Sequence, residues 1–448
     1  MHHDAIQYDK ACFTAASWVR KLRESLPMTV QELTDRFSVK VEYEYLCSGS
    51  FNCCYRLKGL QSIIRFPILG KSVFRYEKTN DEYMVMSYLA RHTSIPVPQI
   101  LTVGSSSQIG PYMVLSFVDG TRLSDHLKRS SDARIPIHLQ PDIDCTFLVF
   151  VYRKMARVLI ELSRCQFSRI GAIRQDRSGN WIASKRPITF NMNELVSCGN
   201  YPPKALPQQA FETARSYFTA LAEMHITHLR TQRNNAVVNE EDCRNKYVAR
   251  QLFLKIAKEF STPYNEGPFP LYCDDLRPTN VIVDADLNIR GVIDWEYCYA
   301  APAELTFCSP WWLLLKHPDE WDDLTEFWEE YRPRHHLFIQ ALQDEENEMI
   351  QRGDLSEHQR LSLRMARSLE NGDFWFCLAA TSSYGFDNIY WTFIDQWRYG
   401  PRTSIEDRIK LLTQEEQDDL VAFVRGKIQQ AEEGELDEHW DAHEKLVA

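Results

Sequence analysis

Apolar and polar positions divide the chain into three stretches with different periods. Residues 1–38 carry apolar side chains at helical spacing. We expect a helix and then a second, short one there, because Thr29 followed by Glu32 is a capping-box pattern. In residues 39–118 the apolar positions alternate with polar ones, which is typical of strands. Residues 119–448 are mostly helical in pattern, so we predict an N-terminal helical extension, a β-rich unit and a large helical unit with these bounds.

The β-rich unit carries three polar features in order. Its first two strands are joined by a turn of small residues, which includes Ser48, Gly49 and Ser50. A later apolar strand contains one cation, Arg65, and the helix predicted over residues 77–92 contains an acid, Glu82. By themselves the turn could be an ordinary hairpin and the two charges an ordinary surface ion pair.

The stretch from Leu271 to Glu296 carries the strongest chemical signal. A predicted strand leads into a polar loop that contains Asp275 and Asn280. Two further β-rich runs follow, and the second of them ends at Asp294. Phosphoryl transfer from Mg-ATP needs one Asp to orient or deprotonate the acceptor hydroxyl, and an Asn with a second Asp to hold the metal. An isolated Asp-x-x-x-x-Asn arises by chance in many proteins, but the order and spacing of this whole stretch favour a kinase.

At these residues the chain resembles the aminoglycoside phosphotransferase and choline kinase group, small-molecule kinases with a protein-kinase-like fold. More narrowly, it is similar to fungal proteins of the phosphotransferase enzyme family, through the segments Asp275–Asn280, Ile293–Glu296 and Ala300–Glu304. The resemblance implies an α+β fold with a small antiparallel-sheet lobe and a large helical lobe. It also implies ATP and Mg²⁺ as cofactors, with Asp275 as the catalytic residue and Asn280 and Asp294 as metal ligands.

The same resemblance assigns roles in the β-rich unit. The turn formed by Ser48, Gly49 and Ser50 would cover the phosphates of ATP, and Arg65 paired with Glu82 would position them. The end of the last strand would connect the two lobes, and backbone groups of about Ser116 to Val118 would contact the adenine.

Two departures from the family pattern stand out. Cys273 and Asp274 replace the usual His-Gly before the catalytic Asp, which puts the rate and the rigidity of the loop in question more than the type of reaction. Arg65 replaces the usual Lys, although Arg binds phosphate bidentately and keeps its charge. For the acceptor pocket we expect Asp274, Glu296, Asp387 and Trp391.

Composition narrows the classes of protein. A content of 44% hydrophobic and 25% charged residues is ordinary for a folded protein. The formal net charge of -11 argues against a nucleic-acid partner. With no apolar run long enough to cross a membrane and no secretory signal pattern, we expect a cytoplasmic protein with no membrane partner. The twelve cysteines are scattered, so reduced and mostly buried thiols are expected.

Two alternatives to a small-molecule kinase remain open. The first is a nucleotide-binding regulator with little turnover, which Cys273 and the single glycine of the turn favour. The second is a protein kinase, which the short connection from Glu296 to Ala300 disfavours because it leaves no room for an activation loop. The sequence identifies neither the hydroxylated acceptor nor the oligomeric state.

Overall fold

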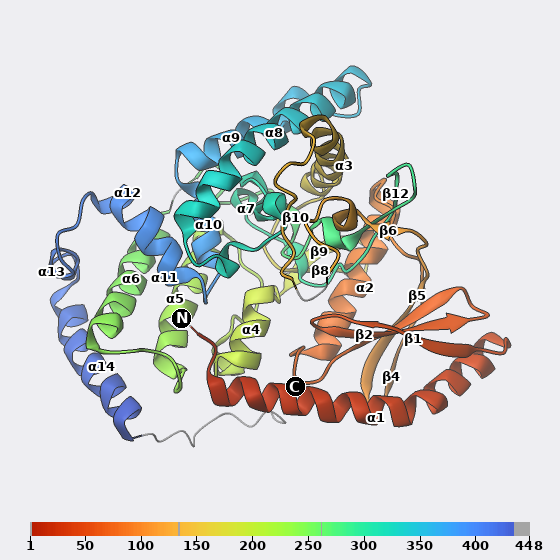
Figure 1. Ribbon diagram of the computed structural model, residues 1–448, viewed down its shortest axis with the longest axis horizontal. Coiled ribbons are helices and arrows are strands. Elements are labelled where there is room, and N and C mark those ends of the chain that lie inside the picture. The colour runs from red at the N-terminus through yellow and green to blue at the C-terminus, as the bar shows by residue number, and fades with distance from the viewer. Residues whose placement is uncertain (1, 133–134, 261, 434–448) are drawn as a thin grey trace.

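The computed structural model describes residues 2–132, 135–260 and 262–433, so the last part of the predicted helical unit, 434–448, lies outside the described residues. The described chain forms a small lobe built on one sheet and a large, mainly helical lobe (Figure 1). The sheet is antiparallel, with the strand order β1-β2-β3-β5-β4. The predicted α+β class is confirmed. The five strands are β1 (Glu42–Ser48), β2 (Asn52–Lys58), β3 (Ser62–Pro67), β4 (Ile100–Ser106) and β5 (Gly110–Ser116).

The N-terminal extension is a single helix, α1 (Ala5–Phe37), of 33 residues. The prediction of a second helix starting near Thr29 is wrong, because Thr29 is buried inside α1 and caps no helix. The apolar stripe of α1 continues past this position and packs on one face of the five-stranded sheet. That packing stabilises the helix beyond what local sequence signals indicate. The buried stripe consists of Trp18, Leu22, Leu26, Val30 and Leu33.

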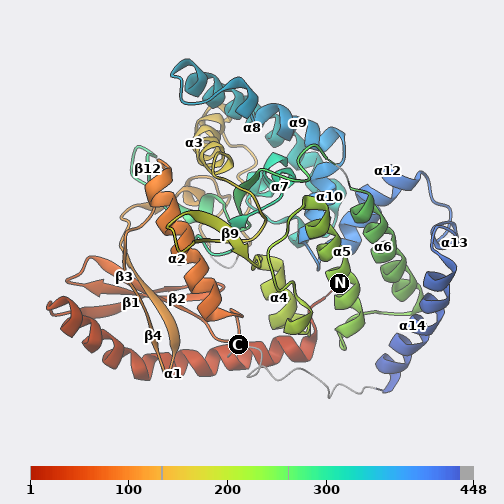
Figure 2. The ribbon, with the colours of Figure 1, turned by 180° about the vertical axis from the view of Figure 1, so that it is seen from behind.

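α1 also contacts the large lobe. Seen from the front and from behind, it runs beneath the sheet and on under α4 (Phe190–Cys198) (Figures 1 and 2). Its N-cap residue, Asp4, is fully buried and accepts hydrogen bonds from the backbone N–H of Gln7 at 3.1 Å and of Asn234 at 2.9 Å. The helix therefore joins the two lobes, because its body packs on the sheet and its first turn is anchored in the large lobe.

The opposite face of the sheet is covered by α2 (Arg75–His92), whose Val85, Met86 and Leu89 pack with Met113 and Leu115 of β5. This helix lies between the sheet and the large lobe. It therefore brings polar residues from its first turns to the junction of the lobes.

In the large lobe, α3 (Cys145–Ser163) is a strongly apolar helix whose buried face belongs to the main core. α8 (Leu324–Gln351) packs against α3, whereas α6 (Glu240–Glu259) and α14 (Gln414–Glu433) lie at the opposite side of the lobe (Figure 1). The other helices of the large lobe are α5 (Ala214–Thr231), α7 (Ala303–Phe307), α9 (Ser362–Glu370), α10 (Asp373–Thr381), α11 (Phe386–Ile389), α12 (Asp395–Tyr399) and α13 (Glu406–Ile409).

Short strands in the large lobe fix the polar loop. One set orders β13-β10-β7 and a second orders β12-β11-β6, while β8 pairs with β9. The loop between β10 and β11 is thus held at both ends by antiparallel pairing. The strands are β6 (Thr121–Arg122), β7 (Gln166–Phe167), β8 (Ala172–Gln175), β9 (Trp181–Lys185), β10 (Phe269–Cys273), β11 (Val281–Val283), β12 (Ile289–Val292) and β13 (Cys298–Ala300).

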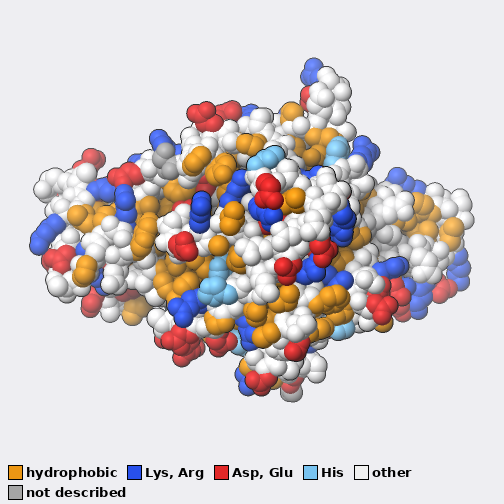
Figure 3. All heavy atoms as spheres, turned by 90° about the horizontal axis from the view of Figure 1, so that it is seen from above, with side chains coloured by type: hydrophobic (Ala, Val, Ile, Leu, Met, Phe, Trp, Pro, Cys, Tyr) orange, Lys and Arg blue, Asp and Glu red, His pale blue; other side chains and the backbone are white. Residues whose placement is uncertain are grey.

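The surface has a mixed charge. Acidic and basic side chains are interspersed among apolar ones over the face seen from above (Figure 3). In the part of the chain that the structure describes, no helix has the length and apolar character needed to span a membrane.

Candidate active site

A cavity of about 1120 Å³ lies where the two lobes meet. From the small lobe it is lined by the β1–β2 turn, by β3 and by the residues that follow β5. From the large lobe it is lined by the loop after β10, the segment after β12, and the residues around α7 and α10. The cavity thus collects the segments on which the sequence places its polar motifs.

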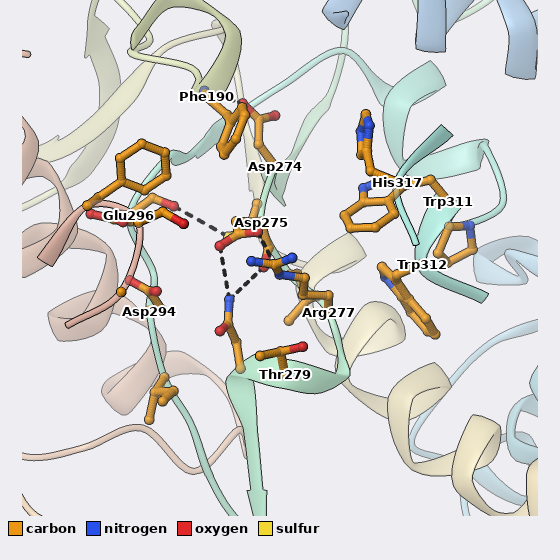
Figure 4. A pocket seen from close by; sticks show the side chains of 18 of the residues that line it. Phe190, Asp274, Asp275, Arg277, Thr279, Asp294, Glu296, Trp311, Trp312 and His317 are labelled. Carbon is orange, nitrogen blue, oxygen red and sulfur yellow. Dashed lines mark hydrogen bonds and ion pairs between the residues drawn. The ribbon is translucent and has the colours of Figure 1, made fainter. Parts of the chain in front are cut away.

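Asp275 lies near the middle of this cavity (Figure 4). The side-chain amide of Asn280 donates to its Oδ2 at 3.2 Å and to its backbone oxygen at 2.8 Å, while Nε of Arg277 lies 2.9 Å from its Oδ1. Two neighbours therefore fix the orientation of the carboxylate. Burial raises the pKa of Asp275 although the Arg277 charge acts to lower it.

Arg277 was not among the residues expected from the sequence. It could have been predicted from its spacing, because a cation two positions after Asp275 in an ordered loop is within reach of that carboxylate. Its side chain is about one-third exposed, at 32%, and lines the cavity. It can therefore contact a bound molecule as well as Asp275.

Asp294 enters the cavity from the segment after β12. Its backbone is left-handed, with φ of 64°, and the preceding N–H of Ile293 donates to the backbone oxygen of Asn280 at 2.8 Å. This bond joins the two segments that carry the expected metal ligands. Burial and the negative charge of Glu296 raise the pKa of Asp294 to about 8, although Arg65 acts in the opposite direction.

Arg65 and Glu82 are brought together as the sequence predicts. Arg65, on β3, forms an ion pair with Glu82, on α2, and its Nη1 also lies 3.0 Å from Oδ1 of Asp294. The Arg65 side chain is 10% exposed and that of Glu82 is 3% exposed, so both charges are held in the interior, and Arg65 lines the cavity.

A second buried ion pair lies beside the first and was not anticipated. Lys78 of α2 pairs with Glu296, and the side-chain amide of Asn52 donates to both oxygens of Glu296 at 3.2 Å. Burial acts to raise the pKa of Glu296, but the charges of Lys78 and Arg65 outweigh it, so the pKa lies below its ordinary value. Glu296 lines the cavity, and at 1% exposure its carboxylate joins α2 to the large lobe through Lys78. Its contact with an acceptor stays a prediction.

The oxygen donors of this region fit a divalent cation. The side-chain N–H₂ of Asn280 is directed at Asp275, so its side-chain oxygen remains as an acceptor, and Asp294 retains a second carboxylate oxygen beyond Arg65. The raised pKa of Asp294 reflects an excess of buried negative charge that a cation would neutralise. No three His, Cys, Asp or Glu side chains among the described residues converge as a complete metal site. Mg²⁺ is commonly held by one or two protein side chains together with phosphate oxygens.

The β1–β2 turn occupies its expected place. Gly49 and Ser50 line the cavity, and the turn is closed by the Gly49 N–H donating to the backbone oxygen of Asn52 at 2.9 Å. Ser48 differs, since it lines a smaller neighbouring pocket against α1.

The lobe connector also borders the cavity through Ser116 and Val118. The backbone N–H of Ser116 donates to Gln99, and that of Phe117 donates to Gln61. These two donors are therefore used within the small lobe, and the backbone groups around Val118 are the remaining candidates for contact with a base.

The side of the cavity away from Asp294 is largely aromatic. Figure 4 shows Trp311, Trp312 and His317 across from Asp275, and the rings of Trp311 and His317 are 4.7 Å apart. Asp274 also lines the cavity and accepts the backbone N–H of Phe190 at 2.9 Å. Burial raises the pKa of Asp274 to about 7.

Two residues expected in the acceptor pocket lie elsewhere, and that expectation is corrected. Asp387 pairs with Arg250 at 2.6 Å. Burial acts to raise the pKa of Asp387, but the charge and the hydrogen bond of Arg250 hold it below its ordinary value. Trp391 is stacked under the guanidinium of Arg402, 4.1 Å from the ring centre. Neither residue lines the cavity that contains Asp275.

Comparisons with solved structures give distant similarities. The aminoglycoside phosphotransferase APH(4)-Ia is 16% identical, with a TM-score of 0.42 over 88% of this chain and 97% of that one. A GDP complex of aminoglycoside 2'-phosphotransferase-IIIa is 15% identical, with a TM-score of 0.42 over 91% of this chain and 99% of that one.

Sequence comparison gives a curated relative and a family. The chain is 23% identical over 251 residues to clavilactone A biosynthesis cluster protein Y of Ampulloclitocybe clavipes. That match takes in 54% of this chain and 55% of the relative, so the chain spans about half the length of the curated protein it matches. The model of the phosphotransferase enzyme family matches residues 74–332, which include α2, Asp275, Asn280 and Asp294. Because this match covers more than half of the chain, the protein belongs to the phosphotransferase enzyme family.

Proposed function

We propose that the protein transfers the γ-phosphoryl group of ATP to a hydroxyl of a small molecule in a Mg²⁺-dependent reaction. The observation that carries this proposal is the convergence of Asp275, Asn280 and Asp294 on one cavity whose wall also holds Arg65, which is paired with Glu82. Phosphoryl transfer depends mainly on positioning and on neutralising charge, and this arrangement supplies groups for both.

Asp275 is the residue that would act on the acceptor. Its carboxylate, held on one oxygen by Arg277 and on the other by Asn280, would align the hydroxyl and accept its proton as the oxygen attacks phosphorus. The carboxylate is oriented before substrate binds, so little ordering is needed during the reaction.

The charged residues around Asp275 would hold the nucleotide. Asp294 and the Asn280 side-chain oxygen would hold Mg²⁺, which when bound neutralises charge on the β- and γ-phosphates. Arg65, fixed by Glu82, would donate to phosphate oxygens, and Gly49 and Ser50 would cover them from the β1–β2 turn. The aromatic side of the cavity, with Trp311 and Trp312, would receive the acceptor.

The first experiment is thermal denaturation of the full chain with ATP, in the presence of Mg²⁺ or of a chelator. A ligand that binds only the folded state stabilises it by about 2.7 kcal/mol at one hundred times its Kd. We expect a rise in melting temperature that needs Mg²⁺ and is lost in Asp294→Asn. The same samples are then assayed for ATP consumption with a panel of hydroxylated small molecules.

A nucleotide-binding regulator is the second candidate, and one contact favours it. Arg65 lies 3.0 Å from Asp294, so a cation on Asp294 has to share that carboxylate with the guanidinium. A Mg²⁺-dependent thermal shift without consumption of ATP on any acceptor would support the regulator. The absence of any shift at millimolar Mg-ATP would contradict both candidates.

A further inference from the structure

Two cysteines face each other across the hairpin that carries the nucleotide turn. Cys47 on β1 and Cys54 on β2 are direct partners in the antiparallel register. Opposed residues in such a pair have Cα atoms about 4.5–5.5 Å apart. Disulfides need about 4.4–6.8 Å between Cα atoms, a range that includes the spacing of paired residues in such a ladder. The ladder is irregular between Tyr45 and Cys47, and Cys47 and Cys54 are the first pair after that point.

Both thiols are on the cavity side of the sheet. Cys47 and Cys54 line the same cavity as Asp275, whereas the neighbouring Cys53 packs on the opposite face among residues that contact α1. Cys47 is half-buried and Cys54 is buried. A small oxidant that enters the cavity can therefore reach Cys47 first.

The two thiols are chemically unequal. A hydrogen bond from Cys54 lowers the pKa of Cys47 to about 6, while the same bond and burial raise the pKa of Cys54. A thiolate is the nucleophilic form of cysteine, and oxidant-sensitive cysteines combine thiolate character, access and a neighbouring second thiol. Cys47 has all three.

We propose that a hydroperoxide oxidises the thiols of Cys47 and Cys54 to a disulfide at the base of the nucleotide turn. The Cys47 thiolate attacks the O–O bond of a hydroperoxide, which forms a sulfenic acid and releases an alcohol, or water from hydrogen peroxide. The sulfur of Cys54 then displaces hydroxide from that sulfenic acid, and the Cys54 proton leaves with the hydroxide as water. Overall, two thiols and one hydroperoxide give one disulfide, one alcohol and one water.

The disulfide would act on the nucleotide site through its neighbours. Cys54 is the register partner of Arg65, and Cys47 is two residues from Gly49. A bond between the two sulfurs would fix the base of the turn and restrict the part of β2 that pairs with Arg65. Weaker binding of Mg-ATP is the expected consequence, and this part rests on the proposed function, whereas the disulfide itself does not.

The chain offers a matched control. Cys273 and Cys298 are also register partners, on β10 and β13, but both are buried. Their mutual hydrogen bond and burial raise the pKa of Cys273 well above its ordinary value. This pair shares the geometry of Cys47 and Cys54 and lacks the accessible thiolate.

The test starts from the fully reduced full chain treated with about one equivalent of hydrogen peroxide. Peptide mass spectrometry without reduction should find the Cys47 peptide linked to the Cys54 peptide with the loss of two hydrogens, reversed by dithiothreitol. The Cys273–Cys298 link should be absent. In Cys54→Ser, a sulfenic acid should persist on Cys47 and react with dimedone, which keeps the test informative if Cys47→Ser does not fold. Oxidation of the exposed Cys145 with Cys47 unmodified would overturn the proposal.

The effect on nucleotide binding is read separately. We expect the Mg-ATP thermal shift of the oxidised protein to fall at least severalfold and to return with dithiothreitol. A cross-link that leaves the shift unchanged would overturn the coupling to the nucleotide site. If the reduced protein shows no shift at all, the proposed function fails, and the cross-link is still judged by mass alone.

Discussion

At the scale of single residues, the two partners of Asp275 determine what its substitution changes. Asp275→Asn keeps the size of the side chain and removes the charge that Arg277 contacts and the group that would accept the hydroxyl proton. We expect phosphoryl transfer to fall by about 10²- to 10⁴-fold, the usual contribution of a general base. The Mg-ATP thermal shift should remain, and Asp286→Asn, at an exposed loop position, should change neither quantity. Full activity in Asp275→Asn would remove this residue from the mechanism.

If the proposed function holds, Asp294 should make nucleotide binding depend on pH. Its pKa is raised to about 8, and a metal ligand must be deprotonated, so Mg²⁺ has to displace a proton at neutral pH. Lowering the pH from 8 to 6 should therefore weaken Mg²⁺-dependent ATP binding, by up to about tenfold per pH unit. Titration calorimetry at both pH values measures this change and the proton release. A pH-independent affinity together with no proton release would contradict the assignment of Asp294.

Asp81 of α2 gives a pH effect on stability outside the cavity. Burial raises the pKa of Asp81 from 3.8 to about 7, even though Lys185 lies 3.7 Å away. The folded state therefore binds more protons between pH 4 and 7, so this group's contribution to stability falls as the pH rises through that window.

Asp81→Asn should remove that dependence. Between pH 5 and 7 the free energy of unfolding of the parent protein should fall relative to Asp81→Asn by at most about 1.4 kcal/mol per pH unit. Urea unfolding at pH 5 and pH 8 measures this difference, with the exposed Glu24→Gln as control. Parallel pH profiles for parent and variant would show that Asp81 is ionised in both states.

At the scale of secondary-structure elements, α1 depends on a cap that the large lobe completes. Asp4 accepts hydrogen bonds from Gln7 at 3.1 Å and from the backbone and side-chain N–H groups of Asn234 at 2.9 and 2.8 Å. Asp4→Ala should lower the free energy of unfolding by about 2–4 kcal/mol, since it removes both a helix cap and buried hydrogen bonds. Urea unfolding tests this, and Asp9→Ala on the exposed face of the same helix should have little effect.

Most elements could be predicted from the sequence because their signals are local. The strand-forming residues of positions 39–118 predicted the strands β1–β5 from local sequence, although β2 and β5 are buried along most of their length and not at alternate residues. The exception is the helix start wrongly predicted at Thr29, which also came from a local signal. Thr29 and Glu32 match a local cap pattern, but the packing of Leu26, Val30 and Leu33 on the sheet keeps the helix continuous, and no local signal contains that contact.

The residues of the candidate site could be predicted where they lie on local motifs, and were missed where they depend on partners far away in the chain. Asp275, Asn280, Asp294 and Arg65 lie on short motifs of fixed order, and all four line one cavity. Glu82 lies behind the cavity wall, where it pairs with Arg65. Lys78 was missed because its partner, Glu296, is 218 residues away in the chain. Asp387 looked available in the sequence for the same reason, since its partner Arg250 is 137 residues away.

At the scale of the whole molecule, the cavity draws on both lobes, so a bound nucleotide should protect them together. Mg-ATP should slow amide exchange in residues 46–54 of the hairpin and in residues 272–296 of the large lobe. Exchange in α14, which lies at the far side of the large lobe (Figure 1), should be unchanged. Hydrogen exchange with mass spectrometry measures all three segments at once. Protection confined to one lobe would show that the nucleotide does not bridge them.

α1 is held by the sheet, which follows it closely in the chain, and by cap residues of the large lobe, which lie much further along. This difference sets the order in which the two contacts can form during synthesis. The sheet that covers its apolar stripe is complete once β5 has left the ribosome, whereas the residues that complete its cap, such as Asn234, emerge more than a hundred residues later. Domains commonly fold as units while the chain is still being made. The small lobe with α1 can therefore assemble first with an open helix end, and that end closes only when the large lobe arrives. The first turn of α1 then becomes native later than the rest of that helix.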